Sequence, residues 1–283
     1  MKFLSYRRDG ADRFGAVRGD LVVDLTSATR FRNLGQALRE LGPQQLRALA
    51  DQGSATLPLA AIDLYRPVVA DPERIVCVGL NYEEHRVEAG RAKTARPSVF
   101  LRLPSSQVGH LQPIVVPREL PEGLDYEGEI AIVMGRGGRR IAPDQALAHV
   151  FGYAPYNDAS ARAWQAHSTQ WTAGKNFPAT GAFGPLLVTS DEIEGRVLSL
   201  TTRLNGQVLQ SADTSMMIFS VPDLIAYAST FTELQPGDVI VTGTPGGVGF
   251  KRNPPLLMKE GDVVEVEVGG VGTLRNPVVA ESR

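Results

Sequence analysis

The sequence predicts an α+β protein that is mostly β, with a strand-rich body, peripheral helices and a small N-terminal α+β domain. Short apolar runs separated by Gly, Pro, Asn and Asp recur along the chain, as expected for strands joined by turns. Helical spacing of apolar residues is confined to a few segments, and strands do not alternate with helices as in a βαβ series. The pattern of strand and helix signals changes near residue 70, so we expect a small domain at 1–70 and a larger domain at 71–283.

Composition and charge narrow the class of protein. The chain has 283 residues, 43% of them hydrophobic, which is enough to bury a sizeable core. The formal charge is -2 and no long basic or acidic block is present. These features argue against nucleic acid or a membrane surface as the main partner.

Cysteine usage and the first residues bear on location. The single cysteine, Cys77, lies in the apolar run IVCVGL, where we expect it to be buried in a strand rather than reactive. It cannot form an internal disulfide, which fits a reducing compartment. The stretch MKFLSYRRDG is polar by its seventh residue, and no apolar run has membrane-spanning length. The sequence therefore predicts a soluble, cytoplasmic protein.

The N-terminal 70 residues contain strand and helix signals. KFLSYRR and GAVRGDLVVDLT are predicted strands, joined by the turn-rich DGADRFG. NLGQALRELGPQQLRALADQG has helical spacing of leucines, interrupted at Gly42-Pro43. We expect LYRPVVADPER to link this segment to the body.

The body contains many strand signals and few helical ones. The Asn-Gly of LNGQ is typical of a type I′ hairpin turn. Helices are expected after Asp158, at SVPDLIAYASTFT and, briefly, at APDQALAHV. The predicted strands are RIVCVGL, SVFLRL, IVVP, GEIAIVMG, FGYAPY, GPLLVT, LSLTTRLNGQVLQ, DVIVTG and DVVEVEVGGVGTLRNPV.

One stretch, LDYEGEIAIVMG, begins with acids and continues as a buried strand does. Side chains alternate along a strand, so Asp125, Glu127 and Glu129 point the same way. Carboxylates grouped at the start of a buried strand need a cation, a proton or open water. A further acid, Asp158, ends the strand-like run FGYAPYNDAS. Glu127, Glu129 and Asp158 together would suit Mg²⁺ or Mn²⁺, whereas a solvated edge strand is the alternative for the two glutamates.

Other polar residues could serve the same site, each with a plainer alternative. Arg162 and Gln165 are three apart, on one helical face with Asp158 a turn earlier. Lys175 could stabilise an oxyanion near a cation, or be an ordinary surface charge.

A histidine and a threonine complete the candidates. His85 and Glu88 are spaced i, i+3 and could form a general-base pair, or an incidental ion pair on an exposed helix. VTGTPGGVGF lacks the Gly-Lys-Ser/Thr of a P-loop and does not match G-x-G-x-x-G. It could bring Thr244 near a ligand or be a purely structural turn.

Taken in order, six motifs resemble the fumarylacetoacetate hydrolase superfamily. The likeness runs from about residue 73 to the C-terminus, and the first 70 residues resemble the small extra domain of the longer bacterial members. The resemblance implies a mixed β-roll fold and a homodimer. The motifs are VGLNYEEH, DYEGEIAIVMG, GYAPYNDASARAWQ, WTAGKNF, LNGQVLQ and PGDVIVTGTPGGVG.

The resemblance also implies roles for individual residues. Mg²⁺ or Mn²⁺ would be held by Glu127, Glu129 and Asp158. His85 and Glu88 match the dyad of a lid. The positions matching catalytic or substrate-contacting residues of the family are Lys175, Arg162, Gln165 and Thr244.

The chain departs from the usual family pattern close to these motifs. Ala163 stands where an Asp is frequent, Asn176 where Ser or Thr is usual, and Pro178 where an Asp is frequent. None of these changes removes a metal ligand.

The leading hypothesis is a metal-dependent hydrolase that cleaves a C–C bond in a 1,3-diketone or 2,4-dioxo acid, such as an acylpyruvate, through a metal-bound enolate. Lys175 would add positive charge, and His85, oriented by Glu88, would activate water when segment 81–95 closes as a lid. Decarboxylation or isomerisation of a 2-oxo acid passes through the same enolate and is the alternative. Ureidoglycolate lyase-type activity and a non-catalytic binding protein are further alternatives.

Overall fold

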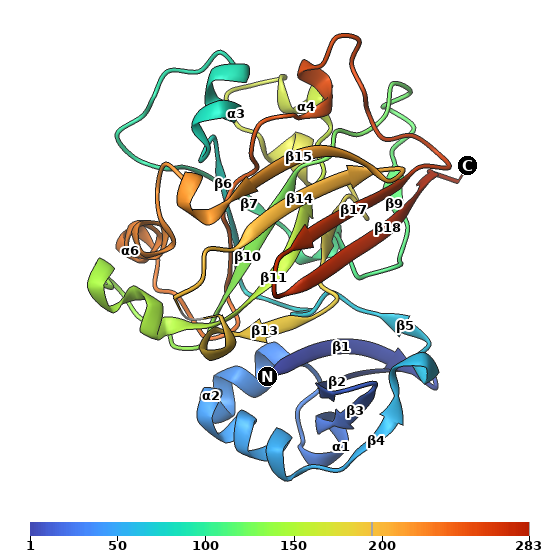
Figure 1. Cartoon of the computed structure of the whole chain (residues 1–283), viewed down its shortest axis with the longest axis vertical. Helices are drawn as coiled ribbons and strands as arrows, with labels where there is room; N and C mark the ends of the chain where they lie inside the picture. Colours follow the sequence, from blue (N-terminus) through green and yellow to red (C-terminus); the bar gives the residue numbers. More distant parts are fainter. Residues whose placement is uncertain (194, 283) are drawn as a thin grey trace.

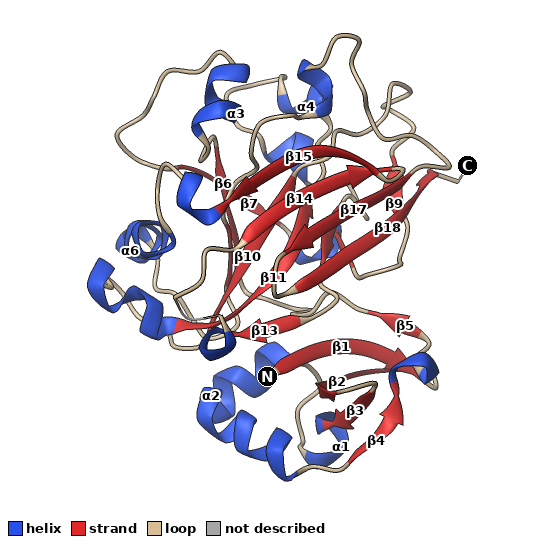
Figure 2. Cartoon of the chain, in the orientation of Figure 1, coloured by secondary structure: helices blue, strands red, loops and turns tan. Residues whose placement is uncertain are grey.

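The computed structural model describes residues 1–193 and 195–282 and consists of two β-sheets with helices at their margins (Figures 1 and 2). The N-terminal strands and helix α2 lie at one end of the molecule, coloured blue in Figure 1. Strands of the second sheet cross the other end. The predicted fold class, α+β with strands dominant, is confirmed.

The larger sheet has 13 strands and runs through both ends of the molecule. Its central path joins N-terminal strands to the body because β1 pairs with β13 antiparallel, Lys2 opposite Val188. Along this path the order is β4 (Ala55–Pro58), β3 (Leu21–Asp24), β2 (Ala11–Arg18), β1 (Lys2–Arg8), β13 (Leu187–Thr189), β11 (Val150–Asp158), β10 (Gly128–Met134), β16 (Val239–Val241), β6 (Ile75–Gly79) and β7 (Ser98–Arg102). Off the path lie β5 (Leu64–Tyr65), β8 (Gln107–Val108) and β12 (Gly181–Phe183).

The second sheet has five strands and packs over the first. Its hairpin between β14 and β15 turns at Asn205 and Gly206, whose φ values of 51° and 81° fit the type I′ turn that LNGQ predicts. The order is β15 (Gln207–Asp213), β14 (Ser199–Leu204), β17 (Val263–Val268), β18 (Gly272–Ala280) and β9 (Ile114–Val116).

Strand β10 is buried on both faces, which explains its continuous apolar run. Ile130 packs in the core between the two sheets, together with Val266 of β17. Ala131 and Val133 face a different core, shared with the N-terminal segment. Polar side chains in this strand are therefore withdrawn from bulk water, and any charge there needs a partner.

The helices lie at the periphery, as predicted. In α2 the chain leaves helical geometry at Gly42, with φ 73°, and Pro43 restarts the helix, so the expected interruption is confirmed. The helices are α1 (Leu25–Ala28), α2 (Leu34–Gln52), α3 (Glu83–Glu88), α4 (Arg162–Gln165), α5 (Thr172–Lys175) and α6 (Val221–Phe231).

One local prediction is wrong. DGADRFG is a turn only at Asp9 and Gly10, because β2 already begins at Ala11 and pairs with β1 from Ala11 to Val17. Long-range strand pairing overrides the local turn signal there. The short helix expected at APDQALAHV is present at Pro143–His149, with 3₁₀ turns.

The N-terminal segment and the body share a core. Phe3 packs against Phe151 of β11 with ring centroids 5.3 Å apart, and both belong to one cluster with Leu38 of α2. The boundary at residue 70 remains a prediction.

Two further expectations concern the single cysteine and membrane-spanning helices. Cys77 is fully buried in β6, and burial raises its thiol pKa well above the ordinary value, so it is a structural rather than a reactive cysteine. In the part of the chain that the structure describes, none of the helices combines the length and apolar character needed to cross a membrane.

His110 gives a prediction for stability. Its ring packs edge-on against Tyr65 of β5 at 5.0 Å, and its Nδ1 accepts a hydrogen bond from the Arg275 amide. Burial, with a smaller effect of Arg275, lowers the pKa of His110 to about 4. The unfolded chain therefore binds this proton more readily, and stability should fall as the pH drops from about 6.5 towards 4.

We predict that His110→Asn, which keeps a hydrogen-bond acceptor, loses less stability than the wild type between pH 7 and pH 5. The difference should be on the order of 1–2 kcal/mol after allowance for solvent screening. Urea unfolding at both pH values measures it, with His167→Asn at an exposed position as the control. Equal pH dependence in all three proteins would contradict the prediction.

Candidate active site

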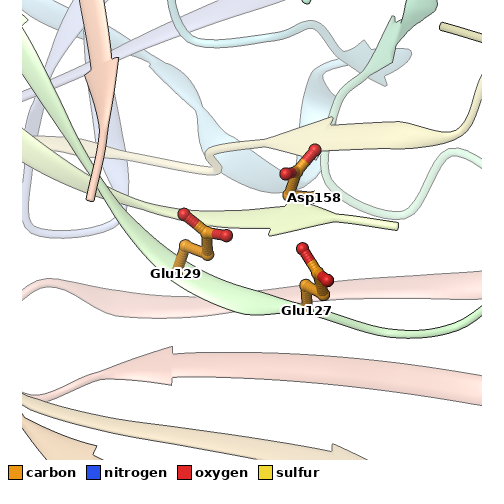
Figure 3. Close-up of side chains that lie close together, drawn as sticks. All are labelled: Glu127, Glu129 and Asp158. Carbon is orange, nitrogen blue, oxygen red and sulfur yellow. The ribbon is translucent and has the colours of Figure 1, made fainter. Parts of the chain in front are cut away.

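Three carboxylates lie together where β10 meets β11. The two strands are antiparallel neighbours, and the Asp158 amide donates to the Glu127 carbonyl at 2.8 Å. Glu127 and Glu129 point from one strand towards Asp158 of the other (Figure 3). One oxygen of each lies within 4.8 Å of the others, and the residues are 4%, 1% and 0% exposed.

The predicted alternative of a solvated edge strand does not apply to these glutamates. Strand β10 lies between β11 and β16, and both glutamates are buried. Asp125, the first acid of the run, is separated from the cluster, because it precedes β10 and pairs with Arg162 instead.

Cationic side chains surround the cluster. Lys175 Nζ lies 2.6 Å from both Glu127 Oε2 and Asp158 Oδ2. Arg162 Nη2 lies 2.6 Å from Glu127 Oε1 in an ion pair. Arg102 Nη1 donates to Asp158 Oδ1 at 2.5 Å. Lys175 is 1% exposed, so the prediction of an ordinary surface lysine is wrong.

The ionisation of the two glutamates differs because their partners differ. Burial opposes the charge of Glu127, but Arg162 and Lys175 outweigh it and hold its pKa below the usual range. Burial and the neighbouring charges of Asp158 and Glu127 raise the pKa of Glu129 well above its ordinary value. Among the described residues, the Gly243 amide alone donates a hydrogen bond to the Glu129 carboxylate, at 2.6 Å. Glu129 is therefore the carboxyl group of the cluster whose negative charge the protein's own cations compensate least.

The donor set fits a small divalent cation. Carboxylate oxygens are the ligands that Mg²⁺ and Mn²⁺ prefer, and no His or Cys takes part in this cluster. A divalent charge would stabilise the ionised form of Glu129, which the protein alone leaves poorly compensated.

Glu127 and Glu129 form part of the floor of a cavity of about 770 Å³. Lys175 and Thr244 also face this cavity, and apolar side chains form much of its wall. Residues of the predicted lid segment contribute as well. The apolar wall residues include Val78, Phe100, Trp171 and Phe250, and the residues of the lid segment are His85, Ala89, Arg91, Ala92 and Thr94.

His85 and Glu88 lie on α3, which follows the cavity-lining end of β6. His85 is 6% exposed, and its Nδ1 lies 3.4 Å from Glu88 Oε2. Glu88 also accepts hydrogen bonds from the Gly247 amide at 3.2 and 3.3 Å. Burial opposes ionisation of Glu88, but the bonds to His85 and to backbone amides outweigh it and lower its pKa.

Arg162 and Gln165 begin and end the short helix α4. Arg162 Nε donates to Asp125 Oδ2 at 2.8 Å, and its Nη1 donates to Gln165 Oε1 at 2.8 Å. The guanidinium also lies over the Phe250 ring, 4.4 Å from its centroid. These contacts hold Arg162 at the cavity wall, between Glu127 and the loop after β16.

Thr244 lies in that loop beside the start of β10. Its hydroxyl donates to the Gly128 carbonyl at 3.0 Å and accepts from Gln210 Nε2 at 2.8 Å. Gly243 precedes it with φ 100°, a conformation that favours glycine, and there its amide reaches Glu129. The structure thus brings all nine predicted site residues to one region.

Sequence reasoning missed Arg102 in this region and, although it singled out Asp125, missed the partners of that residue. Arg102 is fully buried behind Asp158, and its signal is an inverted strand: Leu101 and Leu103 on either side are exposed. Asp125 accepts from the Gly249 and Phe250 amides at 2.7 and 3.2 Å and so joins this loop to Arg162. No spacing in the sequence connects Asp125 with residue 249.

Buried acids at a cavity floor, a buried lysine and a histidine–glutamate pair define a metal-binding enzyme. The fumarylacetoacetate (FAA) hydrolase C-terminal family matches residues 74–279. The chain therefore belongs to the fumarylacetoacetate hydrolase superfamily, as the motifs predict.

Known relatives extend this result. The human protein "Oxaloacetate tautomerase FAHD2A, mitochondrial" is 40% identical over 254 residues, covering 89% of this chain and 79% of the relative. Oxaloacetate tautomerase YisK of Bacillus subtilis is 37% identical over 265 residues, covering 93% and 87%. The structure of maleylpyruvate hydrolase from Sphingobium sp. SYK-6, in complex with manganese (II) ion and pyruvate, shares 27% identity over 100% of both chains, with a TM-score of 0.81.

We predict that Mn²⁺ or Mg²⁺ raises the melting temperature of the wild type and that Glu129→Gln abolishes most of this shift. A ligand bound only by the folded state stabilises it by about 2.7 kcal/mol at 100 times its Kd. Differential scanning calorimetry with metal and with EDTA measures the effect. Glu122→Gln, at an exposed position, should respond like the wild type. An undiminished shift in Glu129→Gln would contradict the assignment.

Proposed function

We propose that this protein catalyses keto–enol tautomerisation of a small 2-oxo diacid, with oxaloacetate as the first candidate. The observation that carries the proposal is the cavity itself, where Lys175 and the two glutamates of the acidic cluster share one space with a single imidazole, that of His85. The names of the relatives at 37% and 40% identity support oxaloacetate as the substrate.

Glu127, Glu129 and Asp158 would hold the divalent cation. When bound, the cation supplies Lewis-acid polarisation of substrate oxygens. Lys175 places a buried ammonium beside the same oxygens; burial opposes this charge, but Asp158 and Glu127 outweigh it and raise its pKa. Lys175 therefore stays charged and stabilises negative charge that develops on the substrate.

His85 would move the proton. In the keto-to-enol direction the C3–H electron pair becomes the C2=C3 π bond, and the C2=O π pair moves onto oxygen. His85 takes the proton from C3 and delivers it to the C2 oxygen, so that the enzyme ends unchanged. Glu88 orients the imidazole through Nδ1, at 3.4 Å, and leaves Nε2 for this transfer.

A diacid needs positive charge beyond the cluster. Arg162, fixed by Asp125 and Gln165, lines the cavity and would bind one carboxylate of the substrate. Lys251 and Arg91 line the cavity too and would attract the second carboxylate. Gln165 and Thr244 would contact its polar atoms.

Hydrolysis of a C–C bond in an acylpyruvate-like 2,4-dioxo acid is the second candidate. It uses the same residues, with His85 activating water instead of moving a substrate proton. The maleylpyruvate hydrolase structure favours it, at a lower identity of 27%. Decarboxylation, ureidoglycolate lyase-type cleavage and binding without turnover would be separate outcomes of the same assays.

We also expect a homodimer, which light scattering on a sizing column would test.

We predict that the purified protein with Mg²⁺ or Mn²⁺ accelerates the decay of enol oxaloacetate to the keto form, followed by ultraviolet absorbance. Metal alone and protein with EDTA are the essential controls, because free cations catalyse this reaction themselves. A panel of acylpyruvates, maleylpyruvate and ureidoglycolate tests the other candidates. Cleavage of an acylpyruvate without enhanced tautomerisation would overturn the proposal in favour of the hydrolase.

We predict that His85→Asn lowers kcat for tautomerisation by about 10²–10⁴-fold, since it removes the proton carrier. Its control is His149→Asn, because His149 precedes β11 at the end of that strand opposite Asp158 and its ring contacts the Arg136 carbonyl, away from the cavity. Unchanged kcat in His85→Asn would exclude the imidazole as the proton carrier.

We predict that Lys175→Met lowers kcat by about 10²–10³-fold, the usual effect of removing one stabilising charge. Lys259→Met, at an exposed position, is the matched control and should keep full activity. A large rise in KM with unchanged kcat would instead assign Lys175 to substrate binding.

A further inference from the structure

Each carboxylate of the cluster has one oxygen held by a donor of the protein. Arg102 Nη1 contacts Asp158 Oδ1 at 2.5 Å, and Arg162 Nη2 lies 2.6 Å from Glu127 Oε1. The Gly243 amide donates to Glu129 Oε2 at 2.6 Å. The second oxygens of Glu127 and Asp158 face the Lys175 ammonium, 2.6 Å from each, and no arginine or backbone donor of the described residues contacts them.

Among these donors, Arg102 is the most firmly placed. Its side chain is 0% exposed, and it also donates to the Thr180 hydroxyl at 2.7 Å, the Ala159 carbonyl at 3.2 Å and the Ser106 hydroxyl at 3.4 Å. It comes from the outer strand of the large sheet, β7, where the Asn176 amide holds the backbone on both sides of it. Asn176 Oδ1 accepts from the Leu103 amide at 2.7 Å, and its Nδ2 donates to the Leu101 carbonyl at 3.2 Å.

Asn176 also follows Lys175 directly in the chain. The residue that holds the backbone around Arg102 is therefore next to the second cation that contacts Asp158. Lys175 reaches Oδ2 at 2.6 Å from the cavity, and Arg102 reaches Oδ1 from within the fold. A divalent cation bound by both oxygens of Asp158 would share Oδ1 with the guanidinium, where two positive charges repel. A cation bound through Oδ2 alone would avoid the guanidinium and would replace the Lys175 ammonium, which reaches Oδ2 from the cavity.

We propose that Arg102 is a positioning residue that restricts Asp158 to one metal-binding oxygen and thereby makes the site discriminate against Ca²⁺. Mg²⁺ and Mn²⁺ accept near-octahedral sets to which each carboxylate gives one oxygen. Ca²⁺ takes six to eight oxygens and gains from bidentate carboxylates. The inference rests on the metal site of the proposed function and adds its selectivity.

The test is the ratio of the dissociation constants for Ca²⁺ and Mn²⁺, measured by calorimetric titration of metal-free protein without substrate. Arg102→Gln has two effects. The loss of one positive charge changes the attraction of all divalent cations alike, so by itself it does not change the ratio. The release of Asp158 Oδ1 favours Ca²⁺ and should lower the ratio of the Ca²⁺ to the Mn²⁺ dissociation constant about tenfold, the scale of change seen when a partner of a metal ligand is removed. Arg102→Lys keeps the positive charge on a smaller donor group, so its ratio should lie between those of the wild type and Arg102→Gln.

A matched control and a milder variant complete the experiment. Arg74→Gln removes an arginine that pairs with another buried aspartate, Asp238, at 3.0 Å, at the other end of β6 from the cavity. Its ratio should equal that of the wild type. Thr180→Val removes the Oγ1 acceptor of Arg102 and keeps the arginine, so it reports on the role if Arg102→Gln does not fold.

An unchanged ratio in folded Arg102→Gln, or in Thr180→Val if that variant alone folds, would overturn the inference. Equal losses of affinity for both cations would also overturn it, because they indicate a purely structural role. Neither result depends on the reaction catalysed. Failure of the tautomerase assay with a normal shift in the ratio would reject the proposed function alone.

Discussion

The structure depends on charges that are buried together where β10 and β11 pair. Moving an unpaired charge out of water costs several kcal/mol, and Glu127 and Asp158 both have charged partners. Lys175 bridges Glu127 and Asp158, and Arg102 and Arg162 complete the set from two other elements. Removal of one member leaves another charge buried without compensation, so the region is a single unit in which position and charge depend on each other.

The loop after β16 connects this unit to the residues above it. Gly243 donates to Glu129, Gly247 donates to Glu88, and Asp125 receives the amides of Gly249 and Phe250. A Cβ on Gly246 would lie 2.6 Å from the Glu84 side chain, so the helix α3 packs against backbone there. The glycine-rich sequence is therefore neither a phosphate-binding loop nor a simple turn. Its backbone amides hold carboxylates from both the floor and the lid of the cavity.

Much of this arrangement could be predicted from the sequence, because the relevant signals are local or belong to a motif. The continuous apolar run after Glu129 indicates a strand buried on both faces, and Asn205-Gly206 indicates the hairpin between β14 and β15. The spacing of His85 and Glu88 places both on one short helix. The role of Arg102 and the partner of Asp125 could not be predicted, since the residues that they contact are 56 and 37 residues away in the sequence.

The central claim is that the acidic cavity moves a proton on an intact 2-oxo diacid. The most direct test is proton NMR of oxaloacetate in D₂O with the Mg²⁺-loaded protein, following exchange at C3 against the amount of substrate remaining. The account predicts C3 exchange faster than with Mg²⁺ alone, with no matching formation of pyruvate, and loss of the enhancement in His85→Asn. Exchange no faster than with Mg²⁺ alone, or substrate loss that keeps pace with exchange, would contradict it.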